Sequence, residues 1–457
     1  MSEFANNFKS HFDVVAALAL SFCLLVGSAL TGVFIAYPLA VSLLLFVFVL
    51  NRRGFAVSDL LKMAIAGAHQ ALPVVKVLLL IGMLTAVWMA AGTVPALVYY
   101  GTQLISAQFF VLWSFGLTAA VSVLIGTSFG SAGTIGVALM VIARASSLDG
   151  GGDTGDVVNP VAGAIIAGAF VGDRCSPMSS SAHLVASITN TDLYNNLRNM
   201  VVSSLWPLAL SVVFYVGLSL LYPVQLSAAS MMTDLPLMFD LSGIVLLPAV
   251  TVLLLAVLRV DVKWAIGVSI VMGCAIAHTL QHYSFVTLFR FLLFGYQLDQ
   301  ETPLQAILLG GGLLPMLRAV LIVLLSTAFA GLFADSRVLS FLDSWLARDR
   351  SNRQLNRATV LVSIMANLFG CTQTIAILLT EQIMRPCYHR QFPEKMGAAQ
   401  LALALEDTAV VIAPLVPWNI AGLIPATVLM VGPGFIPYTG YLLLLPLFVL
   451  FRGDNWL

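Results

Sequence analysis

The chain has 457 residues, of which 60% are hydrophobic and 9% are charged, and its formal net charge is zero. Soluble domains carry about 25% charged residues, so the composition excludes a water-soluble globular protein. A membrane-crossing helix needs about 20 apolar residues, and many runs approach that length. We therefore expect an all-α polytopic membrane protein, because helices satisfy the backbone hydrogen bonds of a spanning segment internally.

The apolar segments follow one another along the whole chain. They cover residues 12–30, 33–50, 74–91, 109–124, 126–142, 157–171, 201–221, 241–258, 264–280, 285–295, 316–333, 360–379, 401–412, 415–430 and 438–451. The first resembles a signal sequence, but another apolar run follows at once, so we expect an uncleaved helix. Several segments are too short to cross alone, which predicts about ten to twelve crossings with some interrupted or re-entrant segments.

Basic residues between the apolar runs indicate the orientation of the chain. One group is formed by Arg52, Arg53 and Lys62, and another by Arg337, Arg348, Arg350, Arg353 and Arg357. The positive-inside rule places both groups in the cytoplasm, so the first two helices form a hairpin and the N-terminus is cytoplasmic. We divide the chain into a hairpin and loop (1–72), a first transport repeat (73–221), connecting helices (222–302), a second repeat (303–440) and a C-terminal end (441–457).

Two sequence matches predict this internal repeat. The segment FGSAGTI (129–135) matches FGCTQTI (369–375), which begins 240 residues later. The segment SPMSSSAHL (176–184) has an approximate match in APLVPWNIA (413–421). In each half, a glycine-interrupted apolar segment precedes a proline-broken one.

The two copies are expected to be inverted in the membrane. The run 74–91 leaves one basic cytoplasmic loop, whereas the run 316–333 ends at the other. Paired interrupted segments in inverted halves indicate the binding site of a secondary transporter. We therefore expect the glycine breaks at Gly130 and Gly370 to lie close together near mid-membrane.

The segment GDRCSPMSSSAHL (172–184) places charges and hydroxyls within an apolar run. An ionisable group at membrane depth is costly and is by default a candidate for function, so we select Asp173, together with Arg174 as a partner for anions. Pro177 breaks the helix after them and frees backbone groups that can bind an ion. The alternative is a salt bridge between Asp173 and Arg174. The hydroxyl ligands expected for a hard cation are Ser176, Ser179 and Ser180.

The corresponding carboxylates of the second half are Glu406 and Asp407, followed by Pro414 and Pro417. Neighbouring helical positions point about 100° apart, so we expect one carboxylate to face the site and the other to pair with a neighbour. Nearby carboxylates raise one another's proton affinity, a property that suits a cation/proton exchanger. The alternative is a helix N-terminus stabilised by acidic residues.

Four further residues are weaker candidates for the site. His183 titrates near neutral pH when unperturbed, although a lone histidine can simply be hydrogen-bonded. Thr134 and Thr374 recur at the same position of the two glycine-interrupted segments. The glycines of these segments either let a ligand approach the backbone closely or let helices pack tightly, and the sequence leaves both roles open. Asn419 follows the second proline break.

No catalytic or metal-binding pattern accompanies these residues. The sequence shows no HExxH pattern, no phosphate-binding glycine loop and no nucleophile elbow. The five cysteines are scattered and predict neither a disulfide framework nor a metal site. We therefore expect neither an enzyme nor a cofactor, and a channel would need a polar lining along several helices that the sequence lacks.

Five motifs together resemble the NhaC-type sodium/proton antiporter family, which includes sodium- and proton-coupled malate/lactate exchangers. They are GTVPALVYYG, GTSFGSAGTIGVALM, GAFVGDRCSP, TNTDLYNNLRNM and LEDTAVVIAPLVPWN. The resemblance spans residues 70–440 and implies a plasma-membrane antiporter of inverted-repeat architecture in the ion transporter superfamily that works by alternating access. Asp173, Glu406 and Asp407 match the family pattern.

The chain departs from that pattern at positions where oxygen ligands are expected. Ser180 stands where the family has Asp, and His183 stands where it has Asn. After Glu-Asp the family tends to have Ser, Gly and Thr, whereas this chain has Thr408, Ala409, Val410 and Ile412. Fewer oxygen ligands bind sodium less readily, which keeps a second substrate class open.

The first functional hypothesis is secondary active exchange of a monovalent cation, sodium, for protons. The alternative is a proton- or sodium-coupled exchanger of a small organic anion or amino acid, held by Arg174 beside hydroxyls and His183. The expected partners are sodium ion, protons, the small carboxylate solute of the alternative, the lipid bilayer and a second copy in a homodimer, with no nucleic acid.

Overall fold

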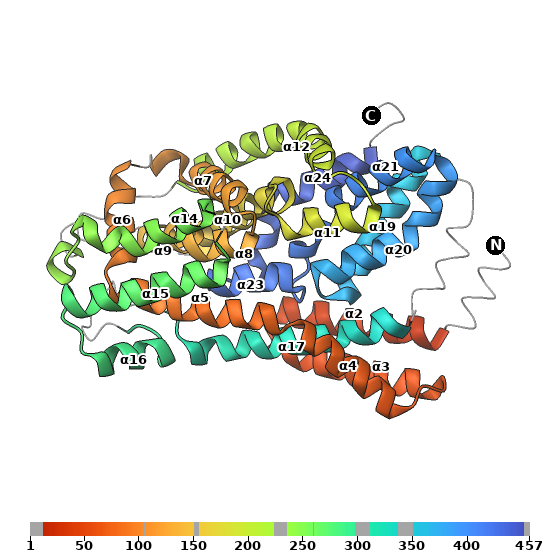
Figure 1. The fold of residues 1–457 in the computed structure, drawn as a ribbon, viewed down its shortest axis with the longest axis horizontal. Helices are drawn as coiled ribbons and strands as arrows, with labels where there is room; N and C mark the ends of the chain where they lie inside the picture. Colours follow the sequence, from red (N-terminus) through yellow and green to blue (C-terminus); the bar gives the residue numbers. More distant parts are fainter. Residues whose placement is uncertain are drawn as a thin grey trace.

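A computed structural model describes residues 12–104, 107–149, 155–223, 235–258, 260–297, 310–336 and 351–451. Helices make up almost all of the regular structure in these ranges, and one isolated antiparallel bridge joins Tyr296 to Gly310. The expectation of an all-α membrane protein is confirmed for the described residues (Figure 1).

The helices follow in chain order. The first part contains α2 (Phe12–Thr31), α3 (Ala36–Arg52), α4 (Val57–Gln70), α5 (Leu72–Ala90), α6 (Thr93–Leu104), η1 (Ala107–Phe109), α7 (Phe110–Ile125), α8 (Ser128–Ser131), η2 (Ala132–Gly136), α9 (Val137–Asp149), α10 (Gly155–Cys175), α11 (Ser180–Thr189) and α12 (Leu193–Leu221). The second contains η3 (Gly243–Leu246), α14 (Leu247–Val257), α15 (Val262–Thr279), α16 (Phe285–Phe294), α17 (Leu313–Ser336), α19 (Asn352–Gly370), α20 (Gln373–Gln391), α21 (Glu394–Asp407), α22 (Ala409–Ile412), η6 (Ala413–Leu415), α23 (Ile420–Val428), η7 (Pro433–Tyr438) and α24 (Gly440–Phe451).

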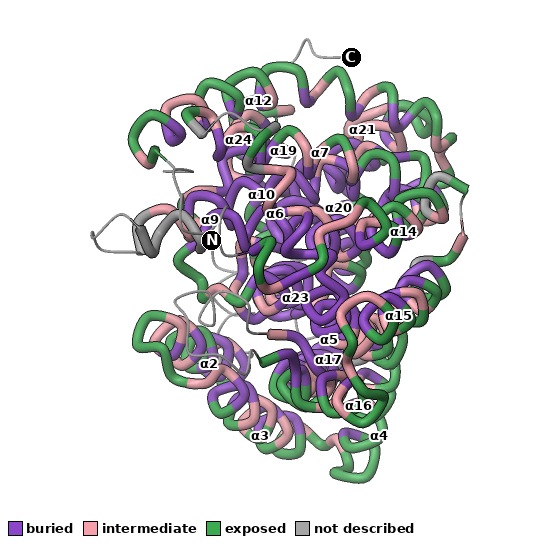
Figure 2. The backbone as a smooth tube through the Cα atoms, turned by 90° about the vertical axis from the view of Figure 1, so that its left-hand side faces the viewer, coloured by how far each residue is buried: buried purple, intermediate pink, exposed green. Residues whose placement is uncertain are grey.

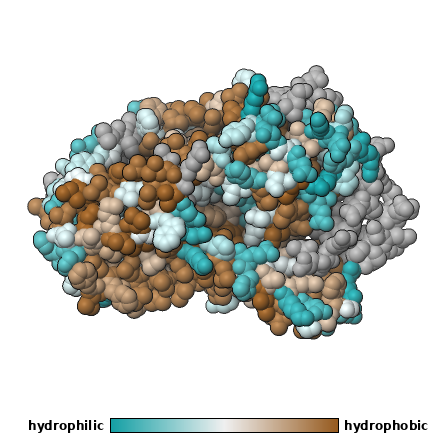
Figure 3. Space-filling view, viewed as in Figure 1, coloured by the Kyte–Doolittle hydropathy of each residue, from teal (hydrophilic) through white to brown (hydrophobic). Residues whose placement is uncertain are grey.

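Length and apolar composition make these helices a membrane bundle. Among the described residues, 5 helices are long and apolar enough to cross a bilayer, and shorter apolar helices of 10–17 residues accompany them. Large apolar side chains such as Leu30, Trp206 and Phe285 are exposed, and much of the surface in Figure 3 is hydrophobic. Because lipid replaces water as the solvent of such a surface, the protein is a multi-pass membrane protein.

The connection 51–72, expected as a loop, contains helix α4, which packs against α17. Gly67 of α4 lies against Gly331, and Gly82 of α5 lies against Met316. From Gly67 to Gly82 the residue numbers rise, whereas the residues of α17 that they contact fall from Gly331 to Met316. α17 is therefore antiparallel to α4 and α5. This agrees with the opposite directions expected for the runs 74–91 and 316–333. Most of the second basic loop (337–350) lies outside the described residues.

Both predicted interrupted segments break in the same way. Gly126 ends α7 with a φ of 74°, and the Thr127 side chain caps α8. Cys371 ends α19 with a φ of 52°, and the Thr372 side chain caps α20. Positive φ suits glycine and strains a residue with a Cβ atom, so the break at Cys371 is held by the surrounding structure rather than by local preference.

The first break lies at Gly126 and not at Gly130, which was the expected position. Gly130 lies inside α8, whereas Gly370 is the last residue of α19. The FGSAGTI and FGCTQTI segments thus match in sequence but not in their position relative to the break. The first segment overlaps the π-helical turn η2 (Ala132–Gly136), and such a turn accommodates an inserted residue within a helix.

The short helices α11 and α23 match in both their beginning and their end. The side chains of Ser179 and Asn419 cap their N-termini, and Asn190 and Met430, two left-handed residues with φ of 52°, lie beyond their ends. These positions are 240 residues apart in each pair. α11 contacts α20 and α21, whereas α23 contacts α8, η2 and α10. Each short helix therefore packs against the other half of the chain.

Two arginines connect the ends of these short helices to the opposite half. Arg144 of α9 donates to Leu429 O (2.7 Å) and Met430 O (2.8 Å) after α23. Arg385 of α20 donates to Ile188 O (2.6 Å) in the last turn of α11. Cationic side chains stabilise the unpaired carbonyls of a helix C-terminus, so both contacts tie the halves together.

Helix α10 forms the centre of the bundle. Figure 2 shows α10 and α23 as mostly buried, while α3, α4 and α12 carry much of the exposed surface. α10 packs most extensively against α7, and a Cβ atom at Gly172 would collide with the α7 backbone at Ser122. This close packing fixes the residue that follows, Asp173.

Candidate functional site

Asp173 lies in the last turn of α10, with 5% of its surface exposed. Its Oδ1 atom accepts a hydrogen bond from the backbone N–H of Ser128 (3.4 Å), the first residue of α8. Its Oδ2 atom accepts one from Gln373 Nε2 (3.0 Å), at the start of α20. The carboxylate therefore lies where the two interrupted segments begin again, and helix N-termini favour negative charge.

The serines on either side of Pro177 donate hydrogen bonds to backbone carbonyl oxygens near the break in the helix. In an unbroken α10, the carbonyl oxygen of Asp173 would accept the N–H of residue 177, but proline has no N–H. The hydroxyls of Ser179 and Ser181 donate to this oxygen instead. The Ser176 hydroxyl donates to Val123 O of α7 (2.8 Å). These hydroxyls are engaged with the backbone in this structure, and none of them contacts the Asp173 carboxylate.

We expect the variant Ser179→Ala/Ser181→Ala to lose about 1–3 kcal/mol of stability, because a buried carbonyl and the α11 N-cap both lose their partner. Thermal unfolding of the purified protein in detergent measures the loss. Ser187→Ala is the matched control, since Ser187 is exposed on the same helix. Equal unfolding temperatures for the double variant and the control would contradict this role.

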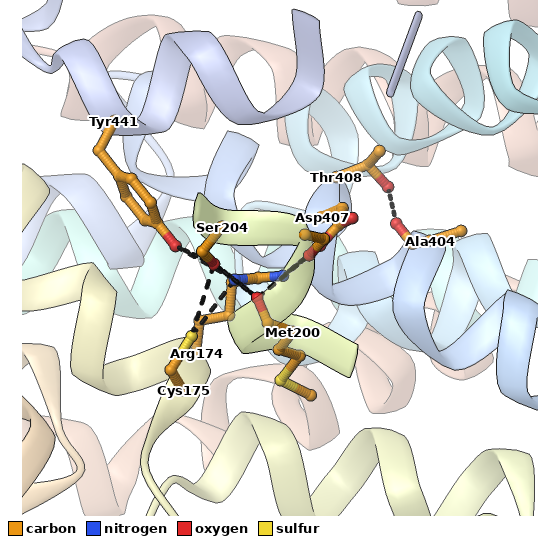
Figure 4. Close-up of polar contacts among 9 residues, drawn as sticks. Arg174, Cys175, Met200, Ser204, Ala404, Asp407, Thr408 and Tyr441 are labelled. Carbon is orange, nitrogen blue, oxygen red and sulfur yellow. Dashed lines mark hydrogen bonds and ion pairs between the residues drawn. The ribbon is translucent and has the colours of Figure 1, made fainter. Parts of the chain in front are cut away.

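Arg174 forms a buried ion pair with Asp407, not with the adjacent Asp173 (Figure 4). The guanidinium and the carboxylate are 0% and 2% exposed. Arg174 also donates to the hydroxyls of Ser203 and Ser204 and to Tyr441 Oη (3.1 Å). The alternative of a salt bridge within the Asp173–Arg174 pair is wrong. Arg174 does pair with an anion, but that anion belongs to the protein and joins α10 to α21.

Glu406 is fully buried beside this ion pair. Within the described part of the chain, neither of its carboxylate oxygens has a hydrogen-bond partner. It interacts electrostatically with Arg174, Asp173 and Asp407. The two adjacent carboxylates therefore differ as expected from helical geometry: Asp407 pairs with a neighbouring helix, and Glu406 is left without a direct partner.

The other candidate residues have different surroundings. Ser180, His183 and Thr374 are exposed, and His183 Nε2 lies 3.0 Å from Pro177 O. Thr134 is buried but donates to Gly130 O (2.7 Å), one turn back in its own helix. Asn419 is buried and donates to Asn367 Oδ1 (3.2 Å). The structure therefore does not bring these five residues to the Asp173 carboxylate.

Several residues that contact Asp173, Arg174 or Asn419 were not among the residues predicted from the sequence. Gln373 stands directly before Thr374 in the segment FGCTQTI, and Asn367 lies one turn before Gly370. Both are polar residues in an apolar run, the same signal that selected Asp173. Ser203, Ser204 and Tyr441 had no such signal, because hydroxyls in membrane helices often bond to their own backbone.

Known proteins resemble this chain over the region that contains these residues. A model of the Na+/H+ antiporter family matches residues 168–451, which is more than half of the chain. The chain is 28% identical to the Na+/H+ antiporter NhaC of Alkalihalophilus pseudofirmus, covering 87% of this chain and 85% of the relative. It is 26% identical to the malate-2H+/Na+-lactate antiporter of Bacillus subtilis, covering 93% and 91%. It is also 26% identical to the arginine/ornithine antiporter ArcD of Halobacterium salinarum, covering 82% and 77%.

These matches confirm the resemblance carried by the five sequence motifs. They extend over the helices that bear Asp173, Arg174, Glu406 and Asp407. The relatives named here are all antiporters, and the described helices are those of a multi-pass membrane protein. The chain therefore belongs to the Na+/H+ antiporter family and is a secondary antiporter.

Proposed function

We propose that this antiporter exchanges sodium ions for protons by alternating access, with Asp173 and Glu406 as the carboxylates that both ions share. The observation that carries the proposal is the buried Glu406 side chain, whose two oxygens have no hydrogen-bond partner in the described residues. A buried carboxylate that accepts no hydrogen bond is costly, and the nearby Arg174 is already paired with Asp407. The Glu406 carboxylate is therefore stable only when it holds a proton or a cation.

Competition for this negative charge couples the two ions. Arg174 already balances Asp407 in the buried ion pair, so Asp173 and Glu406 are left to bind the transported charge. A sodium ion and a proton cannot neutralise the same carboxylate at once. Binding of one therefore favours release of the other, which is the requirement for antiport.

Alternating access requires two halves that move against each other around such a site. We infer that the halves are inverted copies, which is supported by the antiparallel α5 and α17, the matched breaks at Gly126 and Cys371, and the matched short helices α11 and α23. The contacts of Arg144 and Arg385 with the opposite half would then have to change during the transport cycle.

Exchange of a small organic anion or amino acid is the second candidate. It is favoured by the relatives named for malate, lactate, arginine and ornithine. A bound carboxylate needs a cationic partner, and the fully buried Arg174 already pairs with Asp407. The geometry around Asp173 and Glu406 thus offers negative charge and favours a cation.

Flux measurements in proteoliposomes separate these functions. An imposed pH gradient should collapse when sodium is added, because each sodium ion bound displaces protons. The panel includes lithium, potassium, malate, lactate, arginine and ornithine at the same gradient. A response to an organic solute alone would move the function to the second candidate.

Glu406→Gln should lower sodium/proton exchange at least about tenfold, because the amide keeps the shape of the side chain but cannot hold the exchanged charge. The same proteoliposome assay measures the rate. Glu394→Gln is the matched control, since Glu394 is exposed at the start of the same helix. Exchange at the unmodified rate in Glu406→Gln would exclude this side chain from the site.

The proposal includes the membrane in which the protein lies and its orientation. The family and the apolar helices support a multi-pass membrane protein, and we place it in the plasma membrane with a cytoplasmic N-terminus. The positions of Arg52, Arg53 and Lys62 support this orientation. Association into a homodimer stays a prediction.

A further inference from the structure

The side-chain amide of Gln373 lies between two acceptors from different helices. Its Nε2 atom is 3.0 Å from Asp173 Oδ2 of α10 and 3.3 Å from Val410 O of α22. An amide nitrogen has two protons, and these two contacts use both. Asp173 and Val410 thus direct two oxygen atoms at one point, which the nitrogen occupies.

The Val410 carbonyl is available because of a proline. The carbonyl oxygen of a helical residue accepts the N–H four residues later, and for Val410 that residue is Pro414, which has no N–H. The equivalent gap after Asp173 is filled by the Ser179 and Ser181 hydroxyls. At Val410 the side chain that reaches the oxygen is Gln373, at a distance that is long for a hydrogen bond.

We infer that Gln373 occupies the position of the transported cation in this structure and becomes one of its ligands when the cation binds. For the ion to bind, the side chain would withdraw from this point and turn its terminal amide, so that Oε1 rather than Nε2 faces the position that Nε2 has left. Asp173 Oδ2, Val410 O and Gln373 Oε1 would then face the ion, with Glu406 as a second negative charge nearby. The inference rests on the proposed function and adds Gln373 to the ligands of the cation at Asp173.

The chemistry of these ligands fits a small monovalent cation. Carboxylate, carbonyl and amide oxygens are the ligands that hard cations accept. The amide protons and the cation compete for the same two oxygens, so the amide stabilises the empty carboxylate and has to turn away before the ion binds. Gln373 thereby affects sodium affinity directly and not only through the position of α20, whose N-terminus is capped by Thr372.

Two substitutions at position 373 separate a ligand from a structural contact. Gln373→Leu removes both the donors and the oxygen, whereas Gln373→Glu removes the donors but keeps an oxygen. We expect Gln373→Leu to raise the sodium concentration for half-maximal exchange about tenfold or more, because an interaction with a charged group is lost. Gln373→Glu should keep or lower that concentration, because a carboxylate oxygen replaces the amide oxygen.

The experiment measures sodium-driven exchange in proteoliposomes and binding of radioactive sodium to the purified protein at alkaline pH. Gln382→Leu is the matched control on the same helix, since Gln382 is exposed. A loss of sodium affinity in Gln373→Leu that Gln373→Glu does not share, with an unchanged control, would support the inference. Equal loss of affinity in both variants would overturn it while sodium exchange by the unmodified protein stands. Absence of sodium binding and exchange in the unmodified protein would overturn the proposed function and the inference together.

Discussion

Asp173→Asn should reduce sodium/proton exchange to the background rate of empty liposomes while the protein still folds. The amide keeps the shape of the side chain but carries no charge for the ions to share. The Asp173 carboxylate also joins α8 to α20 through Ser128 and Gln373, and an asparagine can still accept one of these two hydrogen bonds through its single oxygen. The loss should therefore appear in transport far more than in stability.

Exchange rates in proteoliposomes and thermal unfolding in detergent test this expectation together. Asp192→Asn is the matched control: Asp192 caps α12 by accepting the N–H of Asn195 (2.9 Å), and asparagine is an equally good cap. It should leave both transport and unfolding unchanged. Full exchange activity in Asp173→Asn would show that this carboxylate is a structural acceptor and does not carry the transported charge.

Much of this site could be predicted from the sequence, because ionisable residues are rare within apolar runs. That rule selected Asp173 and Arg174 of α10 and Glu406 and Asp407 of α21, and the Arg174–Asp407 ion pair joins these two helices. Helical periodicity also predicted that Glu406 and Asp407 would differ. Which of the two would pair with Arg174 depended on the placement of α21 relative to α10, both of which contact α12, and no local sequence pattern records that placement.

The neutral residues that could bind a cation through an oxygen atom were harder to predict than the charged residues. Thr374 was selected because it recurs in both interrupted segments, but α20 begins at Gln373, and one helical step directs Thr374 outward. The serines after Pro177 were expected to face an ion, whereas the absent proline N–H leaves a carbonyl that Ser179 and Ser181 satisfy. Both expectations were made by counting oxygen atoms without assigning the backbone hydrogen bonds that a broken helix leaves open.

The sequence match also misplaced the first helix break. Gly130 aligned with Gly370, but the chain turns at Gly126, where glycine is suited to the positive φ. At Cys371 the same conformation is imposed on a residue that disfavours it. Identical residues in the two segments cannot locate the break, because the residue with positive φ is glycine in one segment and cysteine in the other.

Removal of one partner of the Arg174–Asp407 pair should cause the largest loss of stability. Both side chains are buried, and an uncompensated buried charge costs about 3–5 kcal/mol. We expect Arg174→Met and Asp407→Leu each to unfold at a markedly lower temperature in detergent. Arg174→Met should be the worse of the two, since it leaves Asp407 next to Glu406 with no cation between their charges. In Asp407→Leu, Glu406 can partly balance the arginine.

The double variant Arg174→Met/Asp407→Leu distinguishes the ion pair from simple loss of packing. Replacing a buried pair by apolar residues of similar volume is often close to neutral, so the double variant should recover most of the stability that either single variant loses. Lys62→Met is the exposed control, since its contact with Asp59 lies at the surface and should contribute at most about 1 kcal/mol. Losses that add in the double variant would mean that the two charges do not stabilise each other. In that case Arg174 would be available to a bound anion, and the organic-solute function would become the better explanation of this site.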